Sequence, residues 1–147
     1  MLGAELGEHL EAIGPRGGIG LRQTATSHFF VVDDSSMPAA FAMLEALPAD
    51  TPATALLVTS HGAKSRPASA GAPATSLVWL DRAEMLEMLG DLHPASDTAA
   101  YLFGERHLVR KAGELLVAGG LDGDAVVSKA YWRRDQPNAS HGEPPFN

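Results

Sequence analysis

The sequence predicts one α/β domain built on a parallel β-sheet, and three observations lead to this prediction. Short apolar segments of strand length alternate with segments whose apolar residues recur every three or four positions. The first apolar segment, His-Phe-Phe-Val-Val-Asp at 28–33, is continuous, as is typical of a strand covered on both faces. The chain has 147 residues, 45% of them hydrophobic, which suffices for one compact core. Strands that alternate with helices form parallel sheets with right-handed crossovers.

Five strands are expected, each bounded by turn or cap residues. They are placed at 28–33, 54–60, 76–80, 99–103 and 125–131. The stretch 61–75 is rich in Gly, Ala, Pro and Ser and is expected to be a flexible loop. Residues from 136 onward, with three prolines and a glycine, are expected to be irregular.

Three helices are expected between these strands. The first follows the capping cluster 34–36, tolerates Pro38 in its first turn and stops at Pro48. A short helix is expected over 82–89. A longer one should follow Gly104, present Leu108, Ala112, Leu115 and Leu116 on one face, and end at Gly119-Gly120.

Composition narrows the function classes. A net charge of -7 and a pI near 5.2 disfavour nucleic acid and anionic membranes as general partners, because both require a basic surface. The absence of cysteine excludes disulfides, iron-sulfur ligation by thiolates and thiol catalysis. The first ten residues carry acids where a secretory signal has lysines, and no segment has the apolar length of a membrane span. A soluble, cytoplasmic protein is therefore expected.

Metal and hydrolase chemistry find little support in the motifs. The six histidines, at 9, 28, 61, 93, 107 and 141, show no ligand spacing on a common helix, so no metal site is expected. Ser60-His61 together with Asp33 suggests a hydrolase, but adjacent strand residues point to opposite faces. The chain also has no Gly-x-Ser-x-Gly elbow.

The carboxyl end of the last predicted strand carries the most distinctive chemistry. Ligands bind at the carboxyl ends of strands in open parallel sheets, and Tyr131, Trp132, Arg133 and Arg134 should emerge at that edge. Together with Lys129, the two arginines form a local basic group on an acidic chain, which would attract an anionic ligand.

Several segments resemble one family. Tyr131-Trp-Arg-Arg134, followed by Asn138-Ala-Ser-His-Gly-Glu-Pro144, is similar to the carboxyl terminus of siderophore-interacting proteins. These proteins are flavin-dependent ferric-siderophore reductases related to ferredoxin reductases. Ala100-Tyr-Leu-Phe-Gly-Glu105 resembles the family's strand-turn-helix, and residues 28–48 resemble its first strand and helix. The resemblance covers roughly residues 28–144 and implies a Rossmann-like three-layer sandwich with strand order 3-2-1-4-5.

The resemblance also implies a domain organisation. Residues 25–135 correspond to the NAD(P)-binding-like, siderophore-interacting domain, and 136–147 form a tail. Glu8-His-Leu-Glu-Ala-Ile-Gly-Pro-Arg-Gly17 resembles the last strand and exit turn of the flavin-binding barrel, so residues 1–24 are interpreted as its remnant. Nothing before Gly14 resembles the flavin-binding motif of the barrel. FAD is therefore expected to come from another chain or to be absent, whether the chain is naturally short or truncated.

The implied strand order brings two turns to one crevice. A nicotinamide cofactor's pyrophosphate would rest on Asp34, Ser35 and Ser36, and Gly104-Glu105 would lie near its nicotinamide. The alternative is that these residues only cap helices, because Asp33 and Asp34 are negative and the turn has no Gly-x-Gly-x-x-Gly. Val32 stands where the family commonly has Gly.

The remaining site residues follow from the same resemblance. Tyr131 and Trp132 would border the cofactor, with Trp132 stacking on a flavin or nicotinamide ring. Lys129, Arg133 and Arg134 would meet an anionic ferric-siderophore. The alternative is that the aromatic pair caps the sheet edge and the arginines are solvated.

Two functions remain open at this point. The chain is interpreted as the second domain of a ferric-siderophore reductase that releases iron. Its electrons would come from NAD(P)H or a ferredoxin through FAD on a partner chain. The alternative is a non-catalytic binding or docking module that keeps the Rossmann-like sheet.

Overall fold

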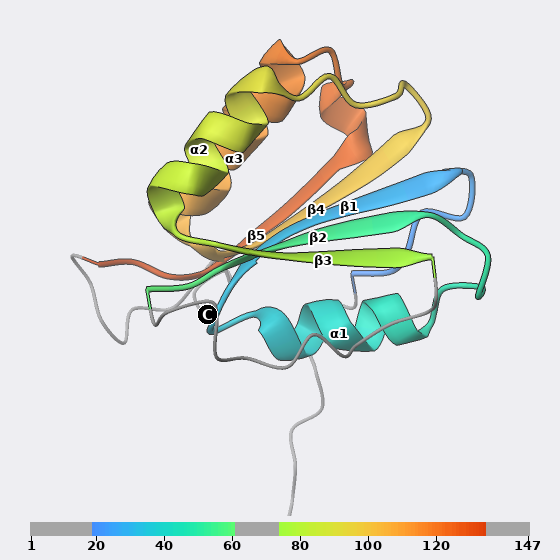
Figure 1. Cartoon of the computed structure of the whole chain (residues 1–147), viewed down its shortest axis with the longest axis horizontal. Helices are drawn as coiled ribbons and strands as arrows, with labels where there is room; N and C mark the ends of the chain where they lie inside the picture. Colours follow the sequence, from blue (N-terminus) through green and yellow to red (C-terminus); the bar gives the residue numbers. More distant parts are fainter. Residues whose placement is uncertain (1–18, 61–73, 135–147) are drawn as a thin grey trace, which may run out of the picture.

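The structure, a computed structural model, describes residues 19–60 and 74–134 (Figure 1). The strands are β1 (Ser27–Asp33), β2 (Ala53–Val58), β3 (Thr75–Leu80), β4 (Thr98–Glu105) and β5 (Val126–Trp132). The helices are α1 (Met37–Glu45), α2 (Arg82–Asp91) and α3 (Arg106–Ala118), and a short 3-10 turn, Gly123–Ala125, precedes β5. The expected barrel remnant up to residue 18, most of the expected loop and the tail from residue 135 lie outside the described residues.

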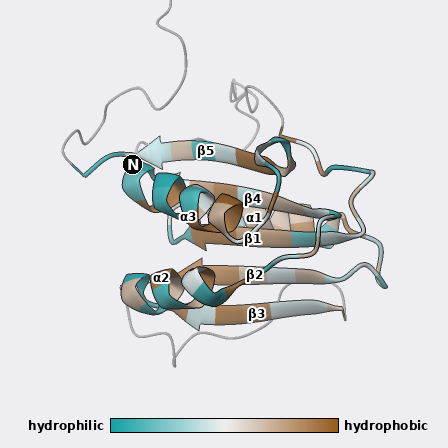
Figure 2. Ribbon diagram, turned by 90° about the horizontal axis from the view of Figure 1, so that it is seen from above, coloured by the Kyte–Doolittle hydropathy of each residue, from teal (hydrophilic) through white to brown (hydrophobic). Residues whose placement is uncertain are grey.

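The strands form one parallel sheet in the order β3-β2-β1-β4-β5, which confirms the predicted fold class (Figure 2). The central strand β1 pairs with β2 and β4, and Val31 lies opposite Leu56 on one side and Leu102 on the other. The chain therefore reverses its direction of travel across the sheet between β1 and β4. The carboxyl ends of these two strands define the switch point, where ligands bind in such sheets.

Helices cover both faces of the sheet, with α2 and α3 on one face and α1 on the other (Figure 1). Successive residues of β1 therefore enter different cores. Phe29 and Val31 pack toward α2 and α3, whereas Phe30 and Val32 pack toward α1. This double burial explains why the sequence of β1 is continuously apolar rather than alternating.

Two of the expected strand ends are misplaced by two residues, and the other strand boundaries shift less. The fourth strand was expected to end at Phe103, but β4 continues through Gly104 and Glu105, which pair with Ala130 and Trp132 of β5. A bulge lies between Gly104 and Glu105, so the glycine is accommodated inside the strand instead of ending it. The second strand ends at Val58, short of the expected Ser60.

The helices begin in three different ways. Ser36 of the expected capping cluster 34–36 occupies the N-cap of α1, but its side chain makes no cap hydrogen bond. Its buried hydroxyl instead donates to the carbonyl of Phe103, at 2.8 Å, across the sheet. Asp81 forms a reciprocal capping box with Glu84 at the start of α2. Glu105 caps α3, which ends before Gly119 as expected.

Within the described parts of the chain, none of the helices combines the length and apolar content that crossing a bilayer requires.

A buried polar cluster at the amino edge of the sheet binds the segment that leads into β1, residues 19–26. The Arg22 amide donates to the hydroxyl of Tyr101 at 2.8 Å, and this hydroxyl lies 3.0 Å from Nδ1 of His28. The phenol oxygen accepts from Arg22, and the His28 tautomer determines which atom donates in its contact with Nδ1. Burial lowers the pKa of His28 below its usual value and raises that of Tyr101.

This cluster predicts a loss of stability in mild acid. His28 has a lowered pKa in the folded state, so the unfolded chain takes up its proton first as the pH falls below about 6.5. The free energy of unfolding, measured in urea from pH 7.5 to 5.5, should fall by about 1.4 kcal/mol for each unit of pKa difference. His28→Asn should flatten this slope. His107→Asn, at an exposed position, should keep it. Equal slopes in the wild type and His28→Asn would contradict the assignment.

Candidate functional site

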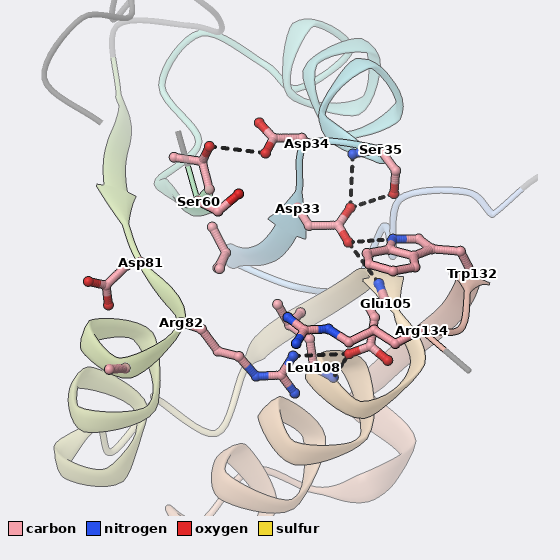
Figure 3. Close-up of a pocket in the computed structure, with 13 residues that line it drawn as sticks. Asp33, Asp34, Ser35, Ser60, Asp81, Arg82, Glu105, Leu108, Trp132 and Arg134 are labelled. Atoms are coloured by element: carbon pink, nitrogen blue, oxygen red, sulfur yellow. Dashed lines mark hydrogen bonds and ion pairs between the residues drawn. The ribbon is translucent and has the colours of Figure 1, made fainter. Parts of the chain in front are cut away.

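A cavity of about 520 Å³ opens at the carboxyl edge of the sheet (Figure 3). All five strand ends contribute to its wall, as the switch-point position predicts. The lining residues are Asp33, Asp34, Ser35, Val58, Thr59, Ser60, Asp81, Arg82, Ala83, Glu105, Leu108, Trp132 and Arg134.

The carboxylate of Asp33 is the centre of the hydrogen-bond network at this edge. One oxygen accepts the Ser35 amide at 3.0 Å and the Ser35 hydroxyl, and the Ser36 hydroxyl oxygen lies 3.2 Å from it. The other accepts the Glu105 amide at 2.8 Å and the indole Nε1–H of Trp132 at 2.9 Å. Asp33 is only 8% exposed, so these contacts join the ends of β1, β4 and β5 largely out of water.

The backbone at Gly104 leaves room for the carboxylate of Asp33. Its φ of 139° lies in the region that favours glycine, and a Cβ there would sit 2.5 Å from both Cγ and Oδ2 of Asp33. The absence of a side chain therefore lets the carboxylate reach the backbone of the next residue.

Glu105 forms a second, separate charge cluster. Its carboxylate accepts the amides of His107 and Leu108, at 2.9 and 3.0 Å, and pairs with the guanidinium of Arg82 at 3.1 Å. Burial alone would raise the pKa of Glu105. The two amides and the guanidinium outweigh burial, so the pKa lies below its usual value. Glu105 is thus a fixed carboxylate that caps α3 and orients Arg82.

The hydrogen-bond donors of the β1–α1 turn are already bonded to other groups of the protein. The Ser35 amide and hydroxyl bind Asp33, the Ser36 amide binds the carbonyl of Asp33, and the Ser36 hydroxyl reaches Phe103. Asp34, the third predicted phosphate-site residue, accepts a hydrogen bond from the hydroxyl of Thr59 at 3.0 Å. Asp34 and Ser35 line the cavity, whereas Ser36 is buried beneath it. A phosphate at this turn would therefore compete with a carboxylate already in place.

The structure separates the residues predicted at the carboxyl end of β5. Trp132 and Arg134 line the cavity, and neither Arg133 nor Lys129 belongs to its wall. Tyr131 packs on the α1 face, stacked on Phe103 with ring centroids 6.1 Å apart, and burial raises its pKa. The Lys129 amine lies 5.8 Å from the centre of the Tyr131 ring. Alternation along the strand explains why 129 and 131 share a face that 132 does not.

Two important residues of the cavity were not predicted. Arg82 was expected only as the first residue of a helix, although its place directly after a strand end was a usable signal. Asp33 was considered as an unfavourable charge near a phosphate and as a possible partner of Ser60-His61, not as the acceptor of a hydrogen-bond network. Its actual partners come from residues 35–36, 105 and 132, and this set could not be inferred from spacing along the chain.

Two guanidinium groups lie on one side of the cavity, and one of them is paired with Glu105. Figure 3 shows the side chains of Arg82 and Arg134 reaching into the cavity near Glu105, with Trp132 beside Asp33. Asp34, Ser60 and Asp81 lie on the other side. In the described ranges, no group of three or more His, Cys, Asp or Glu residues could hold a metal ion. The arrangement is suited to binding an asymmetrically charged ligand with a flat group against the indole.

Comparisons with known proteins agree with this architecture. A family model described as "Siderophore-interacting protein" matches residues 25–135. No curated protein sequence matches the chain. Three solved structures are similar in fold, and the chain spans about half of each, 53% of its length.

The three structures carry printed descriptions of their own. The siderophore-interacting protein SipS from Aeromonas hydrophila is 23% identical with a TM-score of 0.66 over 77% of this chain. A siderophore utilization protein from T. fusca is 24% identical with a TM-score of 0.71 over 88%. The siderophore-interacting protein from Acinetobacter baumannii is 18% identical with a TM-score of 0.67 over 85%.

The contact between Gly104 and Asp33 predicts a large cost for a small substitution. Gly104→Ala should lower the free energy of unfolding by about 1–3 kcal/mol, because alanine is strained at this φ and its Cβ overlaps the carboxylate. Gly90→Ala in α2 is the matched control, since nothing lies within 4 Å of the added Cβ, and it should be neutral or stabilising by about 0.5–1 kcal/mol. Urea denaturation measures both. Similar effects in the two variants would refute the proposed contact.

Proposed function

Because the chain belongs to the siderophore-interacting protein family, we propose that it acts in ferric-siderophore reduction and iron release. In this proposal its cavity receives the ferric complex or the reduced carrier. The flavin is held outside residues 25–135 in this proposal. The observation that supports the proposal is the cavity at the switch point, where an indole and two arginines meet.

The chemistry concerns iron as the substrate. Siderophores hold Fe(III) through hard oxygen donors, and one-electron reduction gives the softer Fe(II), which these donors hold less tightly. FAD would pass electrons to the iron from NAD(P)H or a ferredoxin. The residues of this chain would bind and orient the complex, and they would exclude water from the path between donor and acceptor.

Two features assign roles within the cavity. Arg82 is held by Glu105 at 3.1 Å, so its guanidinium is positioned before a ligand arrives. Arg134 would add a second positive charge for an anionic siderophore. Trp132 is fixed by Asp33, and its ring offers a stacking surface for a catecholate or for a nicotinamide or flavin ring.

A nucleotide remains a candidate electron donor. The β1–α1 turn supports only weak binding of its pyrophosphate, since Ser35 and Ser36 donate their hydrogen bonds to other protein groups. This feature favours a second candidate function, a docking module that keeps the sheet and receives its electrons or its ligand from a partner protein.

Binding of a ferric tris-catecholate, which is strongly anionic, should depend on Arg134 and not on Lys129. Arg134→Ala should weaken affinity roughly tenfold, as expected for one lost charge-assisted hydrogen bond, and added salt should weaken it further. Lys129→Ala removes the same charge outside the cavity wall and should change affinity little. Quenching of Trp132 fluorescence reports binding, and a Trp132→Phe variant gives the contribution of Trp79.

An equal loss in the Arg134→Ala and Lys129→Ala variants would show a response to net charge alone. Failure of the wild type to bind in low salt would favour the docking module.

Cofactor titrations should show weak binding to this chain by itself. FAD should not be retained in equilibrium dialysis, and NADPH should raise the melting temperature little. A ligand at a hundred times its dissociation constant would add about 2.7 kcal/mol of stability, which is easily detected. Stoichiometric FAD at low micromolar concentration would refute the expectation of a flavin held elsewhere. Faster trapping of Fe(II) by a ferrous chelator, when this chain is added to a flavin reductase domain, would support the reductase over the docking module.

A further inference from the structure

We infer that Asp33 is a positioning residue that acts as a built-in anion of the cavity and sets the indole of Trp132 against the ligand space. The first part stands on geometry alone. The second part, contact between the indole and a ligand, rests on the proposed function.

The donors around Asp33 form a ready-made anion site. They include the amide and the hydroxyl of Ser35 in the turn that begins α1, the backbone amide of Glu105, and the indole N–H of Trp132. Converging amides at the start of a helix are a common way to bind a phosphate or carboxylate. Here the protein supplies the carboxylate itself, at the end of the central strand.

The backbone opposite Asp33 is adapted to this carboxylate. Gly104 has no Cβ at the point where one would meet the carboxylate at 2.5 Å, and the next amide donates to it at 2.8 Å. The fit on two sides shows that the contact is built into the fold and is not a single rotamer choice on a surface.

The indole of Trp132 depends on this anion for its orientation. Its Nε1–H donates to Asp33 at 2.9 Å, and this is the hydrogen bond that the structure gives to the indole. Trp132 is the last residue of the edge strand β5, and its side chain is half-buried. Two consequences follow for a ligand. Its anionic groups are directed to Arg82 and Arg134, because the anion position at the turn is already filled, and its flat part meets an indole held in one orientation.

Chemical rescue tests the built-in anion. In a Trp79→Phe background, the near-ultraviolet circular dichroism and fluorescence report Trp132. Asp33→Ala should lose this signal, and formate should restore it by filling the vacated site, with a concurrent rise in melting temperature. The parent protein should not respond to formate. Asp34→Ala is the matched control, since it removes a neighbouring carboxylate that accepts from Thr59 rather than from Trp132, and it should keep the signal.

A conservative variant distinguishes the loss of the carboxylate from general damage to the fold. Asp33→Asn keeps the shape of the side chain but replaces one acceptor oxygen by a donor. It should stay folded, give an altered Trp132 signal and show no rescue, because the amide still occupies the site. A wild-type signal in Asp33→Asn, or a folded Asp33→Ala that formate leaves unchanged, would overturn the inference.

Ligand titration separates this inference from the proposed function. The affinity of Asp33→Ala for ferric tris-catecholate should fall roughly tenfold and recover in formate. If formate restores the Trp132 signal but the parent protein binds no ferric complex, the positioning role of Asp33 stands and the proposed function fails. If the parent protein binds and Asp33→Ala binds equally well without formate, the role of Asp33 in positioning the ligand is refuted while the proposed function stands.

Discussion

One buried carboxylate ties together the part of the molecule on which function depends. Asp33 ends the central strand and accepts hydrogen bonds from the helix turn after β1, from the backbone of β4 and from the last residue of β5. These three segments are separated by about seventy and a hundred residues of sequence. Because a buried charge is tolerated only when it is fully hydrogen-bonded, each segment restricts the conformation of the others. The residues at positions 104 and 132 therefore depend on each other, because both contact the Asp33 carboxylate.

The parallel sheet separates stability from ligand chemistry. The two apolar cores lie on either face of β1 and β4, and the polar cluster of His28 and Tyr101 lies at the amino edge. The cavity lies at the opposite edge, where β1, β4 and β5 end in Asp33, Glu105 and Trp132. Among the described residues, the hydrogen bonds of the His28–Tyr101 cluster and those of the Asp33 network join different groups.

The fold could be predicted because burial determines the sequence of each strand, but the site could be predicted only in part. The continuous apolar run of β1 and the spaced leucines of α3 each follow from local periodicity. The different faces of Tyr131 and Trp132 were also implied by strand alternation, and the error was to treat neighbours as one surface. The departures from helix and strand rules had a different origin. The Ser36 side chain makes no cap bond to α1, and Gly104 does not end β4, because each residue contacts a group on another strand. Contacts of this kind appear only when the strand ends are brought together.

The net charge that a ligand meets in the cavity differs from the sum over its charged lining residues. Asp33 and Glu105 are carboxylates, but each is satisfied by internal donors, and Arg82 offsets the second. With Arg82 paired to Glu105, Arg134 is the positive charge that remains on one side, and Asp34 and Asp81 lie on the other. An acidic protein can therefore present a cationic half-site to an anionic complex. The acidic half-site opposes any second anionic group, so charge orients the ligand and the indole of Trp132 then fixes its plane.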